Sequence, residues 1–220
     1  MNGTETIGDG PHDDWLSRFM SQFSGPHGWL GHVAGWLMAR KNPPINEWIV
    51  EQLGAGRGSR VLEIGFGPGL AAEMLLSRGA RVAGIDKSEV MLQQARWRNR
   101  AAVRDGRADL RQGSAELLPF EDHSFTHAFA VNSFQFWPDR EAALRELRRV
   151  LTPDGRLILA QRMRSEGVGR TDRRRFGMTD EQVAEVQRQL AEAGLQPSTT
   201  ARRLIQDETI CAIAASPVSG

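Results

Sequence analysis

The sequence predicts an α/β fold, a doubly wound and mostly parallel sheet of seven strands with helices on both faces. Strand-like apolar runs alternate with helical patterns from residue 45 onward, which is typical of βαβ units. Near the C-terminus, two strand-like runs are joined by Gln206-Asp207-Glu208 with no helix between them. This arrangement predicts an antiparallel hairpin, so we expect one strand at the edge of the sheet to run against the others.

Composition and charge restrict the classes of protein to consider. The 220 residues are enough for one α/β domain with its own core. The formal net charge of +1 gives no overall field for nucleic acid or an anionic membrane, so neither partner is expected. No apolar stretch approaches the roughly 18 residues of a membrane span, and the polar N-terminus lacks a signal-peptide core. The single cysteine, Cys211, rules out an internal disulfide, which fits a cytoplasmic location.

Residues 1–44 are predicted to form a flexible tail followed by a helical cap. Trp15, Phe19 and Phe23 are spaced four apart, which places them on one face of a helix. Two roles for this cap are compatible with each other: it packs on the main domain, and it closes the substrate pocket. The second role predicts an apolar or aromatic substrate, which Trp29 would contact.

The main domain is expected over residues 45–220, after the helix-breaking pair Pro43-Pro44. Helices are predicted at 45–53, 69–78, 88–102, 139–150 and 179–193. Strands are predicted at 60–64, 81–85, 108–111, 125–131, 156–161, 199–205 and 209–215. Asp154-Gly155 predicts a turn before the fifth of these strands.

The most informative segment joins the first strand to the next helix and reads Glu63-Ile64-Gly65-Phe66-Gly67-Pro68-Gly69. Glycines are needed where the backbone approaches a ligand or takes a positive φ. A strand, a tight glycine loop and a helix form the front edge of a Rossmann-like nucleotide pocket. The spacing argues against the dinucleotide fingerprint, because its third glycine would stand at Leu70, and no Walker lysine follows.

The second strand ends at Asp86, about 20 residues after the glycine loop, where an acidic residue can accept hydrogen bonds from both ribose hydroxyls. The alternative role for Asp86 is an N-cap of the helix that begins near Ser88. Ser88 can also fill that capping position itself.

The segments VLEIGFGPG and VAGIDKSEVML resemble the class I S-adenosylmethionine (SAM) dependent methyltransferases, in particular small bacterial enzymes related to ubiquinone and menaquinone methyltransferases. The resemblance extends over roughly residues 45–215. It implies a Rossmann-like sheet that ends in a hairpin, and methyl transfer from SAM to a small organic acceptor with S-adenosylhomocysteine as the product. No metal is expected, since no histidine has a metal-binding spacing with cysteine or acidic residues.

The resemblance also implies which residues bind SAM. The three glycines are assigned to its carboxypropyl and sugar portion, Glu63 to its amino group, Asp86 to its ribose and the segment 113–120 to its adenine. Within that segment Glu116 either accepts from the exocyclic amine or serves as a cap or a solvated residue. The candidates are Glu63, Gly65, Gly67, Gly69, Asp86, Lys87, Met91, Ser114, Ala115, Glu116, Val131 and Asn132. Lys87 is expected to face solvent.

The acceptor is expected beside the end of the fourth strand, where active sites of such sheets gather. The candidates that would face it are Trp29, Asn132, Phe134, Gln135 and Trp137. Thr126 stands where many relatives have an aspartate of mainly structural role. If the acceptor is a hydroxyl, His27 or His32 in the cap is the candidate general base, and a structural role is the alternative for each.

Two groups of arginines leave other functions open. They are Arg96, Arg98, Arg100, Arg104, Arg107 and Arg111, and then Arg162, Arg164, Arg170, Arg173, Arg174 and Arg175. Solvated faces are the simplest interpretation, and the second group is also suited to hold a phosphate or carboxylate. An RNA- or protein-modifying methyltransferase is the first alternative function, and a non-catalytic SAM-binding module is the second. The oligomeric state stays open, with a homodimer as one alternative.

Overall fold

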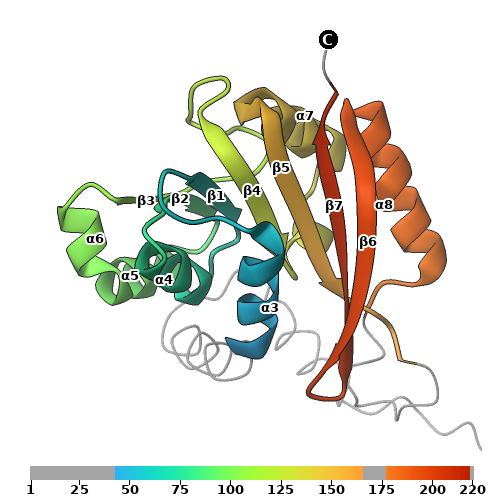
Figure 1. Ribbon diagram of the computed structural model, residues 1–220, viewed down its shortest axis with the longest axis horizontal. Helices are drawn as coiled ribbons and strands as arrows, with labels where there is room; N and C mark the ends of the chain where they lie inside the picture. Colours follow the sequence, from blue (N-terminus) through green and yellow to red (C-terminus); the bar gives the residue numbers. More distant parts are fainter. Residues whose placement is uncertain (1–42, 166–176, 219–220) are drawn as a thin grey trace, which may run out of the picture.

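The computed structural model describes residues 43–165 and 177–218 and contains a seven-stranded sheet with the strand order β3-β2-β1-β4-β5-β7-β6 (Figure 1). The strands are β1 (Arg60–Ile64), β2 (Arg81–Asp86), β3 (Ala108–Gln112), β4 (Phe125–Val131), β5 (Leu151–Arg162), β6 (Leu195–Ile205) and β7 (Glu208–Pro217). The helices are α3 (Pro43–Leu53), α4 (Leu70–Ser77), α5 (Glu89–Arg98), α6 (Arg100–Arg104), α7 (Arg140–Val150) and α8 (Asp180–Glu192), with a short 3₁₀ turn η1 (Phe134–Phe136). The expected fold class is therefore confirmed.

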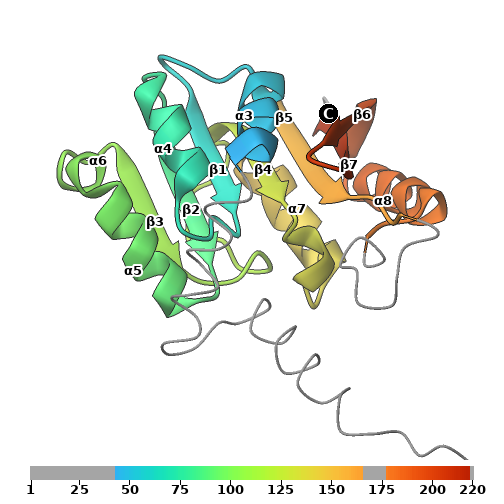
Figure 2. The same cartoon turned by 90° about the horizontal axis from the view of Figure 1, so that it is seen from below.

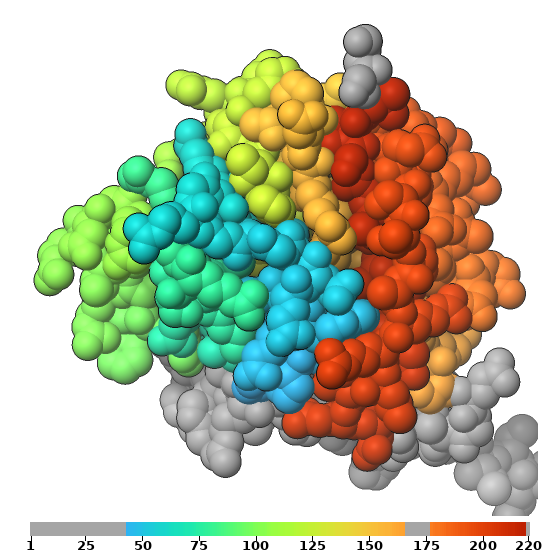
Figure 3. Space-filling model, viewed as in Figure 1, coloured from blue at the N-terminus to red at the C-terminus, as the bar shows by residue number. Residues whose placement is uncertain are grey.

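Helices cover both faces of the sheet (Figure 2). Side chains alternate along β5, so Leu157 and Leu159 join the core shared with α7 and α8, whereas Ile158 and Ala160 join the core shared with α3 and α4. Figure 3 shows α3 on one face of the molecule, beside the hairpin of β6 and β7. Both faces are thus buried, which explains the continuous apolar runs of the central strands.

The hairpin strands are placed differently from the prediction, because the antiparallel strand is not at the edge. β7 runs antiparallel to both of its neighbours, β5 and β6, and the edge strand is β6. The physical reason is composition. β7 is almost entirely buried, whereas β6 carries Pro197, Arg202 and Arg203 and is largely exposed, as suits an edge that must not pair further.

Several predicted boundaries also differ, among them the start of β6, which is Leu195 and not residue 199. The helix expected at 88–102 is divided at Asn99, whose buried Nδ2 donates to the carbonyl oxygens of Gly69 and Ala95, each at 3.0 Å. The fifth strand begins at Leu151, so the turn signal Asp154-Gly155 lies in a bulge within the strand and not before it. The bulge appears as a register shift, since Phe125 pairs with Leu151 but His127 pairs with Arg156.

Several expectations concern residues outside the described ranges, including the tail and most of the cap. Cys211 is buried in the core, as expected. Among the helices of residues 43–165 and 177–218, none is long and apolar enough to cross a membrane.

We predict that Asn99→Ala lowers the free energy of unfolding by about 1–3 kcal/mol, because it leaves two carbonyl oxygens without their buried donor. Urea denaturation measures this change. Gln93→Ala is the matched control on α5, since the Gln93 amide is exposed and reaches only the Glu89 side chain. Equal losses in the two variants would show that Asn99 does not hold the loop.

Candidate active site

The strand ends that carry the predicted cofactor-binding residues lie at one edge of the sheet. β1 to β5 are parallel, and the register pairs Ile64 with Ile85, Asp86 with Gln112 and Val131 with Ala160. The loops after these strands therefore lie along the same edge, where ligands of such sheets bind.

The three glycines are required for different reasons, although each has a positive φ. A Cβ at Gly65 would lie 2.6 Å from the Ser133 Cβ, and one at Gly69 would lie 2.8 Å from the Ala95 Cβ. Both positions are restricted by neighbouring protein atoms. A Cβ at Gly67 would meet no described atom within 4 Å, so Gly67 borders open space. Among the three loop glycines, Gly67 is therefore the one at which the surrounding protein atoms leave space for a side chain.

The Asp86 carboxylate holds the loop in place. Its Oδ2 accepts a hydrogen bond from the Gly67 N–H and its Oδ1 accepts one from the Ser88 N–H, both at 2.8 Å. Asp86 does not cap α5, because the Oγ of Ser88 accepts the N-cap bond from the Met91 N–H. Each carboxylate oxygen keeps a second lone pair, which leaves two positions for ribose hydroxyls. Burial raises the pKa of Asp86, and the bonds from Ser88 and Gly67 partly offset this rise.

The Glu63 carboxyl has the most strongly raised pKa among the described residues of the site. Its carboxyl is buried, with 4% of the residue exposed, and Oε2 has no hydrogen-bond partner among the described residues. Burial raises the pKa of Glu63 well above its usual value, the Asp86 charge raises it further, and a hydrogen bond from the Ala72 backbone lowers it. Such a group is stabilised by a proton or by a nearby cation. The free oxygen and the open space at Gly67 together fit an ammonium-bearing nucleoside such as SAM.

The segment expected to line adenine is only partly available for binding. Ala115 and Met91 are buried. Ser114 forms a bridge with Leu117 that closes a tight loop. Glu116 Oε1 lies 3.5 Å from the Asp139 backbone N–H, which favours a structural contact for this side chain. Lys87 is exposed, as expected.

The residues after β4 separate into two groups. Phe134 and Trp137 are buried in the core and pack edge to face with ring centroids 5.0 Å apart. Asn132, in contrast, has a φ of 52° and uses its Oδ1 to accept the Arg162 N–H at 2.9 Å. Gln135 Oε1 accepts from Gln161 Nε2 at 2.9 Å.

Sequence reasoning missed Gln161 and the ion pair beside it. Arg162 Nε lies 2.7 Å from Glu208 Oε2, and both side chains are largely buried. Glu208 reaches this edge because β7 runs antiparallel. The sequence could have indicated Gln161 as a site residue, because it is a polar residue that directly follows the apolar run 157–160 of a predicted strand. Trp29, His27 and His32 lie outside the described residues.

Thr126, which stands where an aspartate was expected from the resemblance, has structural contacts here. Its Oγ1 accepts from the Arg60 N–H and donates to the Arg60 carbonyl, both at 3.1 Å, and so joins β4 to the start of β1. It also lies 2.8 Å from Nδ1 of His127. Burial, with a smaller effect of Arg156, lowers the pKa of His127.

The first arginine group is only partly neutralised, because its six arginines share three carboxylates as ion-pair partners among the described residues. Its ion pairs are Arg98–Glu73, Arg104–Asp105, Arg107–Asp105 and Arg111–Asp109. Arg96 donates to the Leu110 carbonyl. In the second group, Arg162 is paired with Glu208, and Arg170 to Arg175 lie outside the described ranges.

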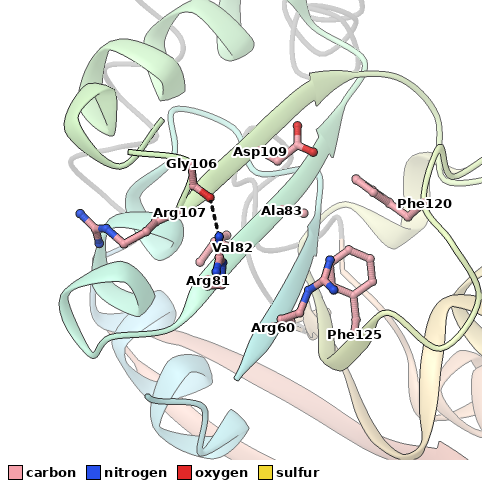
Figure 4. Close-up of a pocket in the computed structure, with 9 residues that line it drawn as sticks. All are labelled: Arg60, Arg81, Val82, Ala83, Gly106, Arg107, Asp109, Phe120 and Phe125. Carbon is pink, nitrogen blue, oxygen red and sulfur yellow. Dashed lines mark hydrogen bonds between the residues drawn. The ribbon is translucent and has the colours of Figure 1, made fainter. Parts of the chain in front are cut away.

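A pocket of about 400 Å³ opens at the opposite edge of the sheet (Figure 4). It is lined by Arg60, Arg81, Val82, Ala83, Gly106, Arg107, Asp109, Phe120 and Phe125. Arg60 and Arg81 begin β1 and β2, so this pocket lies away from the glycine loop and is not the nucleotide site. Within the described ranges, no cluster of three or more histidine, cysteine or acidic side chains is arranged to hold a metal ion.

Comparison with known proteins gives consistent relatives. Residues 62–159 match the model of a family described as a methyltransferase domain. An uncharacterized methyltransferase of Bacillus subtilis, YdaC, is 33% identical over 147 residues, covering 66% of this chain and 79% of the relative. The 27-O-demethylrifamycin SV methyltransferase of Amycolatopsis mediterranei is 33% identical over 158 residues, covering 64% of this chain but only 56% of the relative. Several other relatives are spanned over only about half of their length.

The fold is also shared with solved structures. A SAM-dependent methyltransferase from Aquifex aeolicus superimposes with a TM-score of 0.63 at 20% identity, over 78% of this chain and 89% of that chain. At this identity the likeness concerns the fold alone.

We predict that Gly67→Ala weakens S-adenosylhomocysteine binding by at least about tenfold, because its Cβ occupies the space left for the ligand. Its loss of folding stability is expected to be about 1–2 kcal/mol, from the positive φ alone. Calorimetry and thermal unfolding measure the two effects. Gly106→Ala is the control, with a φ of 67° and no described atom within 4 Å of its Cβ. Unchanged affinity in Gly67→Ala would refute this assignment.

We predict that Glu63→Gln stabilises the ligand-free protein at pH 8 and that this advantage shrinks as the pH falls toward 5. A carboxyl whose folded-state pKa is raised contributes stability that is present below its unfolded pKa and lost as pH rises through the folded value. Glutamine cannot ionise and avoids that loss. Thermal unfolding across this pH range tests the prediction, with exposed Glu51→Gln as the control. A pH-independent difference would contradict it.

Proposed function

We propose that this chain methylates a small organic acceptor of apolar or aromatic character. The chain belongs to the class I SAM-dependent methyltransferases and is an enzyme that uses SAM. The observation that carries the proposal is the arrangement of Glu63, Gly67 and Asp86 at the edge where Asn132 follows β4. The name of the Amycolatopsis relative, which refers to a small-molecule substrate, supports a small organic acceptor, and the apolar or aromatic character rests on the sequence of the predicted cap alone. The formal net charge of +1 gives no overall field that would attract RNA.

The cofactor supplies a methyl group already activated on a sulfonium. The residues therefore mainly bind, align and exclude water. Asp86 would hold the ribose, Glu63 would balance the ammonium group, and Met91 with the Ser114-Ala115 backbone would line adenine.

The acceptor half of the site is proposed at the ends of β4 and β5. Val131 and Asn132 would border the methyl group, with Gln135 from η1 beside them. Trp29 and the candidate bases His27 and His32 stay sequence-based predictions. A base is needed only when the acceptor is a hydroxyl, because its proton must leave as the new bond forms.

A transfer assay with methyl-labelled SAM and an extract of the source cells tests the proposal. The label is sorted into small-molecule, lipid, protein and nucleic-acid fractions. Label in the small-molecule or lipid fraction is the expected result. Label in RNA or protein would overturn the proposed acceptor class and favour the second arginine group as the substrate contact. SAM binding without any labelled product would favour a non-catalytic module.

We predict that Asp86→Ala weakens S-adenosylhomocysteine binding by about 10- to 100-fold, the effect of losing hydrogen bonds to a charged group. A 2′,3′-dideoxy analogue of the ligand separates ribose binding from loop support. The wild-type protein should bind this analogue more weakly than S-adenosylhomocysteine, whereas the variant should bind both equally. If the variant still prefers the ligand with both hydroxyls, Asp86 supports only the loop.

A further inference from the structure

Two amide atoms at the proposed acceptor end of the sheet are buried and have no hydrogen-bond partner within residues 43–165 and 177–218. They are Nδ2 of Asn132, after β4, and Oε1 of Gln161, near the end of β5. Val131 of β4 pairs with Ala160 of β5, and Asn132 and Gln161 are the residues that directly follow this pair on neighbouring segments. Asn132 Oδ1 accepts the Arg162 N–H, which fixes the orientation of its amide and leaves Nδ2 as a free donor. Gln161 is 4% exposed, and its Nε2 is already bonded to Gln135.

Both groups lower stability in the absence of a ligand. A buried polar atom without a partner loses the hydrogen bonds that water gave it in the unfolded chain. Asn132 adds backbone strain through its φ of 52°, a conformation that asparagine tolerates better than most residues. Asn132 thus combines a strained backbone with an unpaired buried donor, and such costs in stability are typical of residues that serve a function.

We propose that Asn132 and Gln161 together bind a hydroxyl group of the acceptor, which is therefore an alcohol or a phenol. The Nδ2 of Asn132 donates to the hydroxyl oxygen, and the hydroxyl donates its hydrogen to Oε1 of Gln161. One donor and one acceptor on neighbouring strands match a hydroxyl, which accepts and donates at once. An ether, a thioether or a bare aromatic ring cannot satisfy both atoms.

The assignment rests on the proposed function and adds a specificity-determining residue, Gln161, to it. A site built to hydrogen-bond a substrate hydroxyl discriminates strongly against analogues that lack it, because the buried protein atoms are then left unpaired. The neighbouring ion pair of Arg162 and Glu208 keeps the end of β5 ordered, and Arg162 also supplies the N–H that orients Asn132.

The chain offers a matched pair of variants for the test. Gln189, on α8, also has a buried Oε1 without a partner, and its Nε2 donates to Glu185. Gln161→Met and Gln189→Met therefore remove the same kind of unpaired amide, one at the acceptor edge and one on a distant helix. Three quantities are measured in each: the unfolding midpoint, S-adenosylhomocysteine affinity, and the rate of labelled methyl transfer into the small-molecule fraction of a cell extract.

For Gln161→Met we expect an unfolding midpoint at least as high as that of the wild type and an affinity within about twofold, with transfer reduced by about 100-fold. Gln189→Met should keep full transfer. Asn132→Asp is the second variant, because its Oδ1 still accepts the Arg162 N–H while the free donor is replaced by an oxygen. It should lose transfer to a similar extent, and the acceptor isolated from the extract should contain an alcohol or phenol.

Three outcomes would overturn the inference alone: full transfer in Gln161→Met and Asn132→Asp, a loss of transfer that only follows lost S-adenosylhomocysteine binding, or a labelled acceptor without a hydroxyl. Absence of label from every small molecule, with the wild-type protein binding S-adenosylhomocysteine, would instead overturn the proposed function and the inference with it. The wild-type control thus separates the two failures.

Discussion

The hydrogen bond from the Gly67 N–H to the Asp86 carboxylate is the interaction on which the cofactor half of the site depends. It ties the loop after β1 to the end of β2. Two further side chains act on the same loop from other segments: Ser133 donates to the Ile64 carbonyl, and Asn99 donates to the Gly69 carbonyl. Three segments therefore hold one loop, so its shape is set during folding and need not be ordered again when a ligand binds.

The site combines this rigidity with local destabilisation. Glu63 and Asp86 bring two buried carboxyls near each other, and the pKa of each is raised. The amides of Asn132 and Gln161 lack partners. The surrounding core, in which Leu62, Phe129 and Leu157 are fully buried, outweighs these costs. A cationic ligand near Glu63 and a hydroxyl near Gln161 would each remove one source of instability.

Local patterns predicted the cofactor half because its residues are close in sequence. The glycine loop and Asp86 follow directly from strands whose composition is evident. The remaining features depend on contacts between distant segments. Asn99 lies where the helix is divided, and its side chain donates a hydrogen bond to the Gly69 carbonyl. Arg162 forms its ion pair with Glu208 only because β7 pairs with β5. The position of β7 inside the sheet could have been predicted, because the sequence of β7 is far more apolar than that of β6.

The two halves of the site also differ in how far the family likeness reaches. The matched segment, residues 62–159, contains the glycine loop, Asp86 and Asn132 but ends before Gln161. The cofactor half is built from backbone groups and short side chains that any acceptor can share. The proposed acceptor half includes residues beyond the matched segment at the end of β5: Gln161, whose side chain bonds Gln135, and Arg162, whose backbone N–H bonds Asn132. Substrate choice in this chain is therefore expected to depend on the end of β5 more than on the residues that define the family.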